Sequence, residues 1–505
     1  MSNKFIFVPL FFLITSVIGG LNYYSPVPVQ DYWDQSINFY NEILDGNYSI
    51  WFSLHNEHRI VITRLLYYLV HKFIPDHEYF LTVINYFLFL LLYYLIIKFG
   101  FVGNYFQNTK LNIKLYFASF IFSAGFFWSQ KLNFFFEVQS QVILSFILPL
   151  ISFYFLDCYL RDNKLKNILL SVLIAVFSSF TIVSGILTLP IIALFLLFLR
   201  STNPYIFFII TIFIINIFVY FSGYSSQNHS SIIINLVDYH VNIFDFFISL
   251  LGNPFSFLLG KSLFSQYISK LIGLFYIYLI FRKIRSFSKN SKSTNTIFIC
   301  FSFYLIGVAI LTSIGRVHMG VQEAFSGRYS SAIILLWISL ILIYSNEIIR
   351  FFSTNPRMGK GILCIIIILM FIYQTTAFKD NENKFIYRKA ASIALYLNIE
   401  DDEILNKIYP DIERLKSISI KAKTYNISIF RKLKDLFDSD INKNYILENF
   451  DQYDLKYINN EFSRIVFDDE RYKKGFYVFR GINDKILGYG FSNKHGKFVG
   501  YIYNN

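Results

Sequence analysis

YFLTVINYFLFLLLYYLIIK, residues 79–98, is the stretch that decides the fold class of this chain. An α-helix needs about 20 mainly apolar residues to cross the hydrocarbon core of a membrane. Runs of this kind recur from Phe5 to Ala377, and the chain of 505 residues is 55% hydrophobic and 16% charged. Soluble domains carry about 25% charged residues. The pattern predicts a polytopic α-helical membrane protein.

The apolar runs predict about eleven membrane spans. We expect them near residues 5–21, 79–98, 115–128, 141–158, two short spans within 168–199, 204–222, 265–281, 297–314, 331–349 and 361–377. Lys and Arg gather in the connections at 98–114, 159–167, 282–296 and 350–360. Because basic loops stay in the cytoplasm, the N-terminus is expected there and the chain after the last span is expected outside.

The spans at 1–377 form the predicted transmembrane domain, which carries a large first outer loop at 22–78. Within this loop, residues 60–73 are apolar but interrupted by charged side chains, which is typical of a helix lying in the interface. Residues 244–264 contain Gly252-Asn253-Pro254, which breaks a helix, so this segment is expected to be interfacial or re-entrant.

The tail at 378–505 lacks long apolar runs and mixes charges of both signs. Apolar residues at helical spacing predict helices at 384–397 and 400–408. Alternating apolar residues between Gly and Asn turns predict strands at 476–480, 486–491 and 498–503. The tail is therefore expected to be a small α+β soluble domain outside the cytoplasm.

Several function classes do not fit the composition. The net charge of +13 comes from Lys and Arg that gather in short loops, which indicates membrane topology rather than nucleic-acid binding. Cys158, Cys300 and Cys364 lie in or beside predicted spans, so they offer neither a disulfide framework nor a zinc site. The sequence has no Gly-rich phosphate loop of the ATPase type and no Gly-x-Ser-x-Gly elbow.

The first outer loop begins with an acidic pair, Asp31 and Asp34, with Trp33 between them. Two carboxylates three residues apart share one side of a helix or turn. Such a pair can bind a divalent cation, or one member can take a proton from an attacking hydroxyl. Asp31 is also placed to cap a helix after Pro26 and Pro28, and one aspartate can cap while the other reacts.

The same loop then carries His55-Asn56-Glu57-His58-Arg59. Arginine binds phosphate through two parallel hydrogen bonds, and His and Glu hydrogen-bond hydroxyls, so this cluster is a candidate pocket for a phosphate and a sugar. The two histidines lack a clear third ligand for zinc. For both clusters the alternative is a solvated loop with a tight turn.

A third outer cluster lies between the predicted spans at 297–314 and 331–349. It comprises Arg316, His318, Glu323, Arg328 and Tyr329. Two arginines on the outer side depart from the charge bias and favour a phosphate-bearing lipid headgroup; simple anchoring to headgroups is the alternative. Glu137, Gln139 and Gln141, at the outer ends of their spans, are candidates to complete a pocket shared with Arg59.

These motifs together resemble a known class. The Asp-x-Trp-Asp-Gln and His-Asn-Glu-His-Arg-Ile motifs, with Gly315-Arg316 and Gly327-Arg328-Tyr329, are similar to a group of bacterial multi-pass membrane proteins. The early acidic motif in a large outer loop, the many spans and the outer tail resemble the GT-C class of integral-membrane glycosyltransferases. The resemblance implies a sugar carried on a polyprenyl phosphate and transferred, outside the cytoplasm, to an envelope lipid, glycan or protein.

The resemblance also implies roles for the site residues. The first-loop acid of the class corresponds to Asp31 or Asp34, which would activate the acceptor hydroxyl for an inverting transfer. Arg59, Arg316 and Arg328 would stabilise the charge on the departing phosphate. The resemblance assigns no definite cofactor, and a divalent cation at Asp31 and Asp34 fits this chemistry. The implied location is the inner membrane of a bacterium, with no nucleic-acid partner.

Two other functions share the basic pocket. A flippase or transporter for a lipid-linked glycan would need ionisable groups at mid-membrane depth, and Asp157 and Lys270 lie only near span ends. A glycan polymerase would use the outer arginines but would not need the first-loop aspartates.

Overall fold

The structure is a computed structural model. It describes residues 7–74, 77–102, 111–199, 204–224, 232–260, 262–286, 296–438, 443–447 and 453–504. Parts of the predicted basic connections at 98–114 and 282–296 lie outside the described residues.

The chain divides into two compact units. The first, here the helical unit, comprises Met1–Leu21, Phe52–Thr63 and Val83–Phe378. The second, here the loop–tail unit, comprises Asn22–Trp51, Arg64–Thr82 and Lys379–Asn505. The sequence places the first outer loop with the spans, whereas the contacts group most of that loop with the tail.

Six helical segments among the described residues are long and apolar enough to cross a membrane. They are built on helices α4 (His77–Val102), α5 (Leu111–Gly125), α7 (Ser140–Asp162), α14 (Leu263–Ser286), α15 (Thr296–Arg316) and α18 (Pro356–Gln374). A seventh candidate is the pair α16 (Ser330–Ile343) and α17 (Ser345–Thr354), which is bent by 68°. The apolar helices therefore fit a membrane protein, as predicted.

The remaining predicted spans form helices that are too short for the same test. They are α1 (Phe7–Tyr23), α8 (Leu165–Ser179), α9 (Thr188–Leu199) and α10 (Tyr205–Phe221). The structure thus supports six to seven spans rather than the predicted eleven, because these four helices have 17 residues or fewer.

Two predicted breaks in apolar segments are confirmed. Residues 168–199 separate into α8 and α9 through the 3₁₀ turn η6 (Val183–Leu187), where a Cβ on Gly185 would lie 2.0 Å from the carbonyl oxygen of Ser178. Gly252 separates α12 (His240–Leu251) from α13 (Asn253–Leu258), and a Cβ there would lie 1.9 Å from the carbonyl oxygen of Ser269 in α14. Both turns need glycine because backbone approaches backbone closely. A short helix, α11 (Ile232–Asp238), precedes α12.

The first outer loop is mostly helical. It forms the π-helical turn η2 (Trp33–Asn38), α2 (Phe39–Leu44), the 3₁₀ turn η3 (Tyr48–Trp51) and α3 (Val61–Phe73). The predicted helix at 60–73 is confirmed by α3. Tyr32 and Trp33 are fully buried, and the indole of Trp33 donates to the carbonyl oxygen of Pro28 at 3.0 Å. Burial of these rings fixes the backbone that carries the acidic pair.

The tail begins with four helices, α19 (Glu382–Leu397), α20 (Asp402–Leu405), α21 (Ile412–Thr424) and α22 (Ile429–Phe437). The helix predicted at 384–397 is confirmed, whereas the one predicted at 400–408 shrinks to the single turn α20. Helices α21 and α22 were not predicted.

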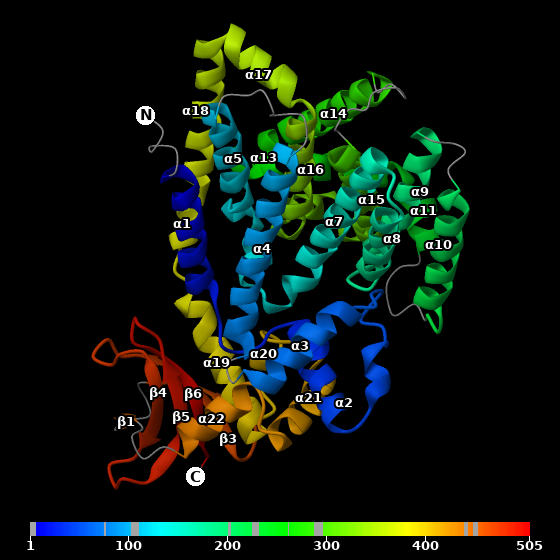
Figure 1. The fold of residues 1–505 in the computed structure, drawn as a ribbon. Helices are drawn as coiled ribbons and strands as arrows, with labels where there is room; N and C mark the ends of the chain where they lie inside the picture. The colour runs from blue at the N-terminus through cyan, green and yellow to red at the C-terminus, as the bar shows by residue number, and fades with distance from the viewer. Residues whose placement is uncertain are drawn as a thin grey trace. The chain divides into compact units, whose positions relative to one another are not determined.

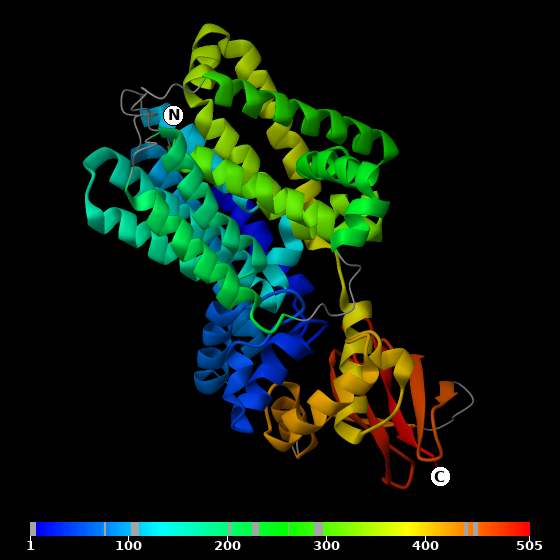
Figure 2. The same cartoon turned by 90° about the vertical axis from the view of Figure 1, so that its right-hand side faces the viewer.

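A six-stranded sheet follows, in the order β1-β4-β5-β6-β3-β2. The strands are β1 (Lys443–Ile446), β2 (Asp454–Tyr457), β3 (Phe462–Asp468), β4 (Gly475–Arg480), β5 (Ile486–Ser492) and β6 (Lys497–Tyr503). Only β1 and β4 pair in parallel. The three predicted strands are confirmed as β4, β5 and β6. Helix α19 packs on β5 and β6 (Figures 1 and 2), and the opposite face buries Ile465, Phe479 and Phe498.

Candidate functional site

The two aspartates of the first loop have different surroundings within the loop–tail unit. Asp31 is exposed. Asp34 is held on both carboxylate oxygens: Arg414 donates from Nε and Nη2 to Oδ1, each at 2.5 Å, and the Tyr409 hydroxyl donates to Oδ2. Burial and the neighbouring Asp34 carboxylate raise the pKa of Tyr409, so this hydroxyl stays a neutral donor. Asp34 therefore ties the loop to the tail.

The arginine on Asp34 also bears on the predicted divalent cation. A metal ion at the acidic pair would compete with the guanidinium of Arg414 for the same oxygen, so Asp34 is a poor cation ligand here. Among the described residues, no group of three or more His, Cys, Asp or Glu side chains is arranged to hold a metal ion.

Glu42 and Asp45 repeat this arrangement one helix further on. Nζ of Lys421 in α21 lies 2.8 Å from Oε1 of Glu42 and 2.6 Å from Oδ2 of Asp45, and the Tyr425 hydroxyl donates to Asp45. The hydrogen bonds from Lys421 lower the pKa of both carboxyl groups. The first loop thus presents acids to the basic face of α21.

Glu78 is the third contact of this kind and the most buried. Its carboxylate is fully buried in the first turn of α4, where Ser428 donates to Oε1 and Lys432 of α22 lies 3.4 Å from Oε2. A buried carboxylate needs such partners because desolvation is costly. We call Asp34, Glu42, Asp45 and Glu78 the docking acids.

The docking acids other than Asp34 were missed in the sequence. A signal was present: Arg414 and Lys421 are seven residues apart, so they lie on one face of α21. The acids that they meet are more than 370 residues away in the chain, and no local pattern links the two sets.

The His-Asn-Glu-His-Arg motif lies in the helical unit and forms a tight turn. His55 and His58 exchange backbone hydrogen bonds of 2.8 and 2.9 Å, with Asn56 in the left-handed region at φ 49°. Nδ1 of His58 accepts from the backbone of Val183 at 3.5 Å, and the carbonyl oxygen of Glu57 accepts from the Tyr220 hydroxyl at 3.4 Å. The motif packs against η6 and α10 through these contacts.

Arg59 at the end of this motif is buried, and its side chain donates hydrogen bonds to backbone carbonyl oxygens. Its guanidinium donates to the carbonyl oxygens of Tyr220, at 2.5 Å, and of Phe52 and Ser222. Tyr220 and Ser222 lie at the C-terminal end of α10, where helical carbonyls lack intrahelical partners. The contacts make Arg59 a cap for α10 rather than a ligand for a phosphate.

Glu137 and Gln141 are both buried in the helical unit. Glu137 opens the 3₁₀ turn η5 (Glu137–Gln139), and Gln141 lies in the first turn of α7. The side-chain oxygen of Gln141 has no hydrogen-bond partner among the described residues. They stay candidates for a polar site beside α7, and no described contact joins them to the arginines.

The connection between α15 and α16 is the best-formed polar site. It consists of three 3₁₀ turns, η7 (Val317–Met319), η8 (Val321–Phe325) and η9 (Gly327–Tyr329). The amide nitrogen of the fully buried Asn253 donates to the carbonyl oxygens of Ala324, at 2.8 Å, and Ser326, at 3.0 Å. The conformation of the connection is therefore fixed by α13.

A second buried asparagine holds the other end of the connection. Asn133, in α6 (Lys131–Phe135), donates to the carbonyl oxygen of Arg328 at 3.1 Å and to the Ser331 hydroxyl at 2.7 Å. A Cβ on Gly327 would lie 2.6 Å from the carbonyl oxygen of Ser129, so the backbone approaches closely there. Asn133 and Asn253 were not predicted to support the site. From the local sequence alone, an asparagine indicates a turn or loop and not a buried hydrogen-bond donor.

The connection brings four of the predicted residues together. Arg328 lies 3.1 Å from Glu323, and its guanidinium carbon is 5.7 Å from the centre of the Tyr329 ring. Arg316, Arg328 and Glu323 all lie close enough to act electrostatically on the Tyr329 hydroxyl. Among the described residues, no acid lies within ion-pair distance of Arg316. Two arginines and one glutamate leave a net positive charge, and we call these four residues the 316–329 site.

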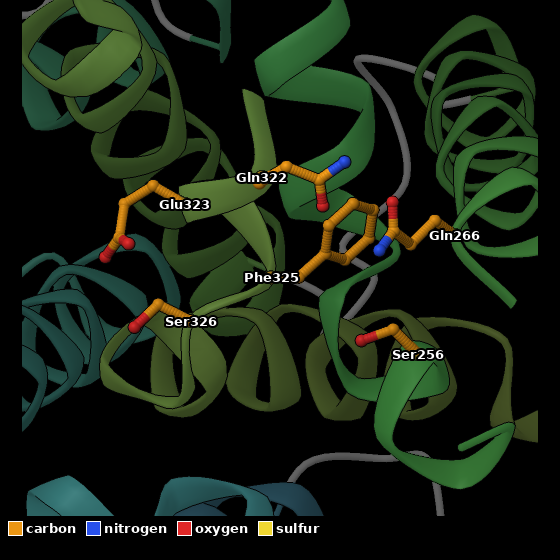
Figure 3. A pocket seen from close by; sticks show the side chains of 6 residues that line it. All are labelled: Ser256, Gln266, Gln322, Glu323, Phe325 and Ser326. Atoms are coloured by element: carbon orange, nitrogen blue, oxygen red, sulfur yellow. The ribbon is translucent and has the colours of Figure 1, made fainter. Parts of the chain in front are cut away.

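A polar cavity of about 280 Å³ adjoins the site. Figure 3 shows its lining side chains: four come from the connection and one each from α13 and α14. The lining residues are Ser256, Gln266, Gln322, Glu323, Phe325 and Ser326. Amides and hydroxyls both donate and accept hydrogen bonds, which suits a ligand rich in hydroxyl groups. Because Glu323 both lines the cavity and pairs with Arg328, the polar space and the cationic patch are continuous.

No protein-family model, curated protein or solved structure matches this chain. The likeness to GT-C glycosyltransferases therefore stands on the motif residues alone. Within the helical unit, the 316–329 site and its cavity offer an anion-binding patch beside a space for a neutral polar group.

Proposed function

We propose that the protein is an integral-membrane glycosyltransferase that moves a sugar from a polyprenyl-phosphate donor to an envelope lipid, glycan or protein. The observation that carries the proposal is the shared residue Glu323. It links an unbalanced pair of arginines, suited to a phosphate, with a cavity lined by amides, hydroxyls and one aromatic ring, suited to a sugar. A donor of this class presents those two groups side by side.

The proposed reaction is a displacement at the sugar's anomeric carbon. The acceptor oxygen forms the new bond to that carbon while the bond from the carbon to the phosphate oxygen breaks, and the polyprenyl phosphate leaves with the bonding electrons. Arg316 and Arg328 stabilise the charge that grows on the phosphate. The acceptor proton passes to a first-loop carboxylate. The resemblance gives that role to Asp31 or Asp34, and we take Asp31 as the base to be tested.

The proposal includes the finer topology. Eleven crossings, with the N-terminus in the cytoplasm and the tail outside the inner membrane of a bacterium, would place the 316–329 site on the side where donor sugars are transferred. In this topology, the four shorter apolar helices cross the membrane where the bilayer is locally thinned around them.

A binding and transfer assay tests the proposal on the purified full chain. The probes are polyprenyl phosphate for binding and a radiolabelled polyprenyl-phosphate hexose, with envelope extract as acceptor, for transfer. Arg328→Lys keeps the charge but loses the two parallel hydrogen bonds of a guanidinium, so the binding of polyprenyl phosphate should weaken about tenfold. The double variant Arg316→Gln with Arg328→Gln should abolish that binding. Arg357→Gln, an exposed arginine of α18, is the matched control.

The acid is tested in the same assay. Asp31→Asn should leave polyprenyl phosphate binding intact and lower transfer about a hundred- to ten-thousand-fold, the usual range for loss of a general base. Unchanged binding in the double arginine variant would reject the phosphate site. Normal binding with full transfer in Asp31→Asn would reject only the assigned base.

A further inference from the structure

An apolar groove crosses the surface of the helical unit between α9, α14 and α15. Its volume of about 460 Å³ falls in the usual range for ligand pockets. All but one of the lining residues are apolar. They are Leu187, Pro190, Ile191, Leu194, Phe195, Phe198, Ile280, Ile284, Ile299, Phe303 and Gly307, and the exception is Lys283.

One end of this groove is lined by residues in the terminal turns of three helices. Lys283 and Ile284 lie in the last turn of α14, Phe198 lies in the last turn of α9, and Ile299 lies in the first turn of α15. At the other end, Leu187 closes over Gly307, where a Cβ would lie 2.7 Å from the leucine Cδ1. The groove therefore runs inward from a set of helix ends and stops within the bundle, as a single hydrocarbon chain entering from one leaflet would require.

The open end carries excess positive charge. Lys283 lies 2.9 Å from Glu347 of α17 and 4.8 Å from the centre of the Tyr344 ring. Arg282 and Arg285 flank Lys283 on the last turn of α14 and are exposed. Three cations against one carboxylate form a patch that attracts an anionic headgroup at the membrane surface.

We propose that this groove binds one acyl chain of an anionic glycerophospholipid, whose phosphate meets Arg282, Lys283 and Arg285. This lipid is distinct from the proposed donor. The cations lie at the α14 end that adjoins the start of α15, whereas Arg316 ends α15, and a helix of 21 residues is about 30 Å long. The two anion sites thus lie at opposite ends of α15, and a donor phosphate at Arg316 would not reach Lys283.

Native mass spectrometry of the full chain in detergent tests the proposal. The probes are phosphatidylglycerol and phosphatidylcholine with the same acyl chains, added to delipidated protein. We expect phosphatidylglycerol to be retained at least tenfold more. Leu194→Trp, which fills the groove, should abolish retention, whereas Leu197→Trp should not, since Leu197 is an exposed residue of the same helix outside the groove.

The charge is tested by Arg282→Gln with Arg285→Gln, which leaves the Lys283–Glu347 pair in place. The double variant should lose the preference for phosphatidylglycerol, and Lys166→Gln at an exposed site should keep it. A single symmetric peak in size-exclusion chromatography checks that each variant folds. Equal retention of both lipids by the unmodified chain, or displacement of phosphatidylglycerol by polyprenyl phosphate, would overturn the proposal. Neither outcome bears on sugar transfer, because no turnover is measured.

Discussion

The charged groups of the loop–tail unit and those of the α15–α16 connection use the same residue types in opposite ways. In the loop–tail unit, each docking acid meets a cation and a second hydrogen-bond donor, as Asp34 meets Arg414 and Tyr409. In the connection, Glu323 pairs with Arg328 at 3.1 Å, and among the described residues no acid lies within ion-pair distance of Arg316. Balanced pairs hold segments of the fold together, whereas an unbalanced charge beside a cavity remains for a ligand.

The same contrast separates two arginines within the helical unit. Arg59 is 9% exposed and donates to three backbone carbonyls, so its hydrogen-bonding capacity serves the fold. The side chain of Arg328 is 46% exposed and borders a polar cavity. From the sequence both were candidates for one phosphate pocket, and only burial and partners distinguish them.

The largest expected effect comes from removing the buried arginine. Arg59→Gln leaves carbonyl oxygens of Phe52, Tyr220 and Ser222 without their donor, at a cost of about 3–5 kcal/mol, since hydrogen bonds to charged groups are the strong ones. The midpoint of thermal unfolding in detergent should fall sharply. Arg328→Gln should leave that midpoint nearly unchanged. Equal effects of the two variants would remove the distinction between cap and site.

A smaller effect is expected at the most buried docking acid. Lys432→Met removes the cation beside the fully buried Glu78 carboxylate and leaves Ser428 as its hydrogen-bond donor among the described residues, which should cost about 1.5–3 kcal/mol. Lys434→Met, on an exposed position of the same helix, is the control. Thermal unfolding and limited proteolysis of the tail both report the difference. A stable Lys432→Met protein would mean that Glu78 is not held by its charge partner.

The smallest effect is expected from the exposed docking acids, and it depends on pH. Lys421 lowers the pKa of Glu42 and Asp45 below their ordinary values of 4.5 and 3.8. A lowered pKa in the folded state gives stability that is complete above those ordinary values and lost as the pH falls through the lower ones. The Lys421–Glu42 pair should contribute less than about 1 kcal/mol.

Lys421→Met exposes this dependence. The unmodified chain should be slightly more stable than the variant near pH 7, and the two midpoints of thermal unfolding should converge as the pH falls below these ordinary pKa values. Lys421 itself has its pKa raised above 10.5 by the two carboxylates, so its contribution persists up to that pH and declines only beyond it. A difference that grows in acid would contradict the assigned pairs.

The helix breaks show which features of the fold can be predicted from the local sequence. A break within residues 168–199 and another at Gly252-Asn253-Pro254 were predicted to interrupt apolar runs, and both do. Only six or seven of the eleven predicted spans form helices long enough to cross a membrane, because hydropathy measures the length of an apolar run and not the length of the helix within it. Strands β1 and β2 escaped prediction because each has only four residues and β2 is exposed throughout.

The sequence by itself determined the apolar helices, the mixed α+β tail and the set of polar residues worth testing, because hydrophobic periodicity and turn residues act over a few positions. Only the tertiary structure decided which of those side chains are bonded to other parts of the fold. Asp34 meets Tyr409 across 375 residues of chain, and Arg59 meets Tyr220 across 161. Whether a charged side chain binds a ligand or holds the fold depends on such distant partners and on burial, and neither is encoded in the residue's own neighbourhood.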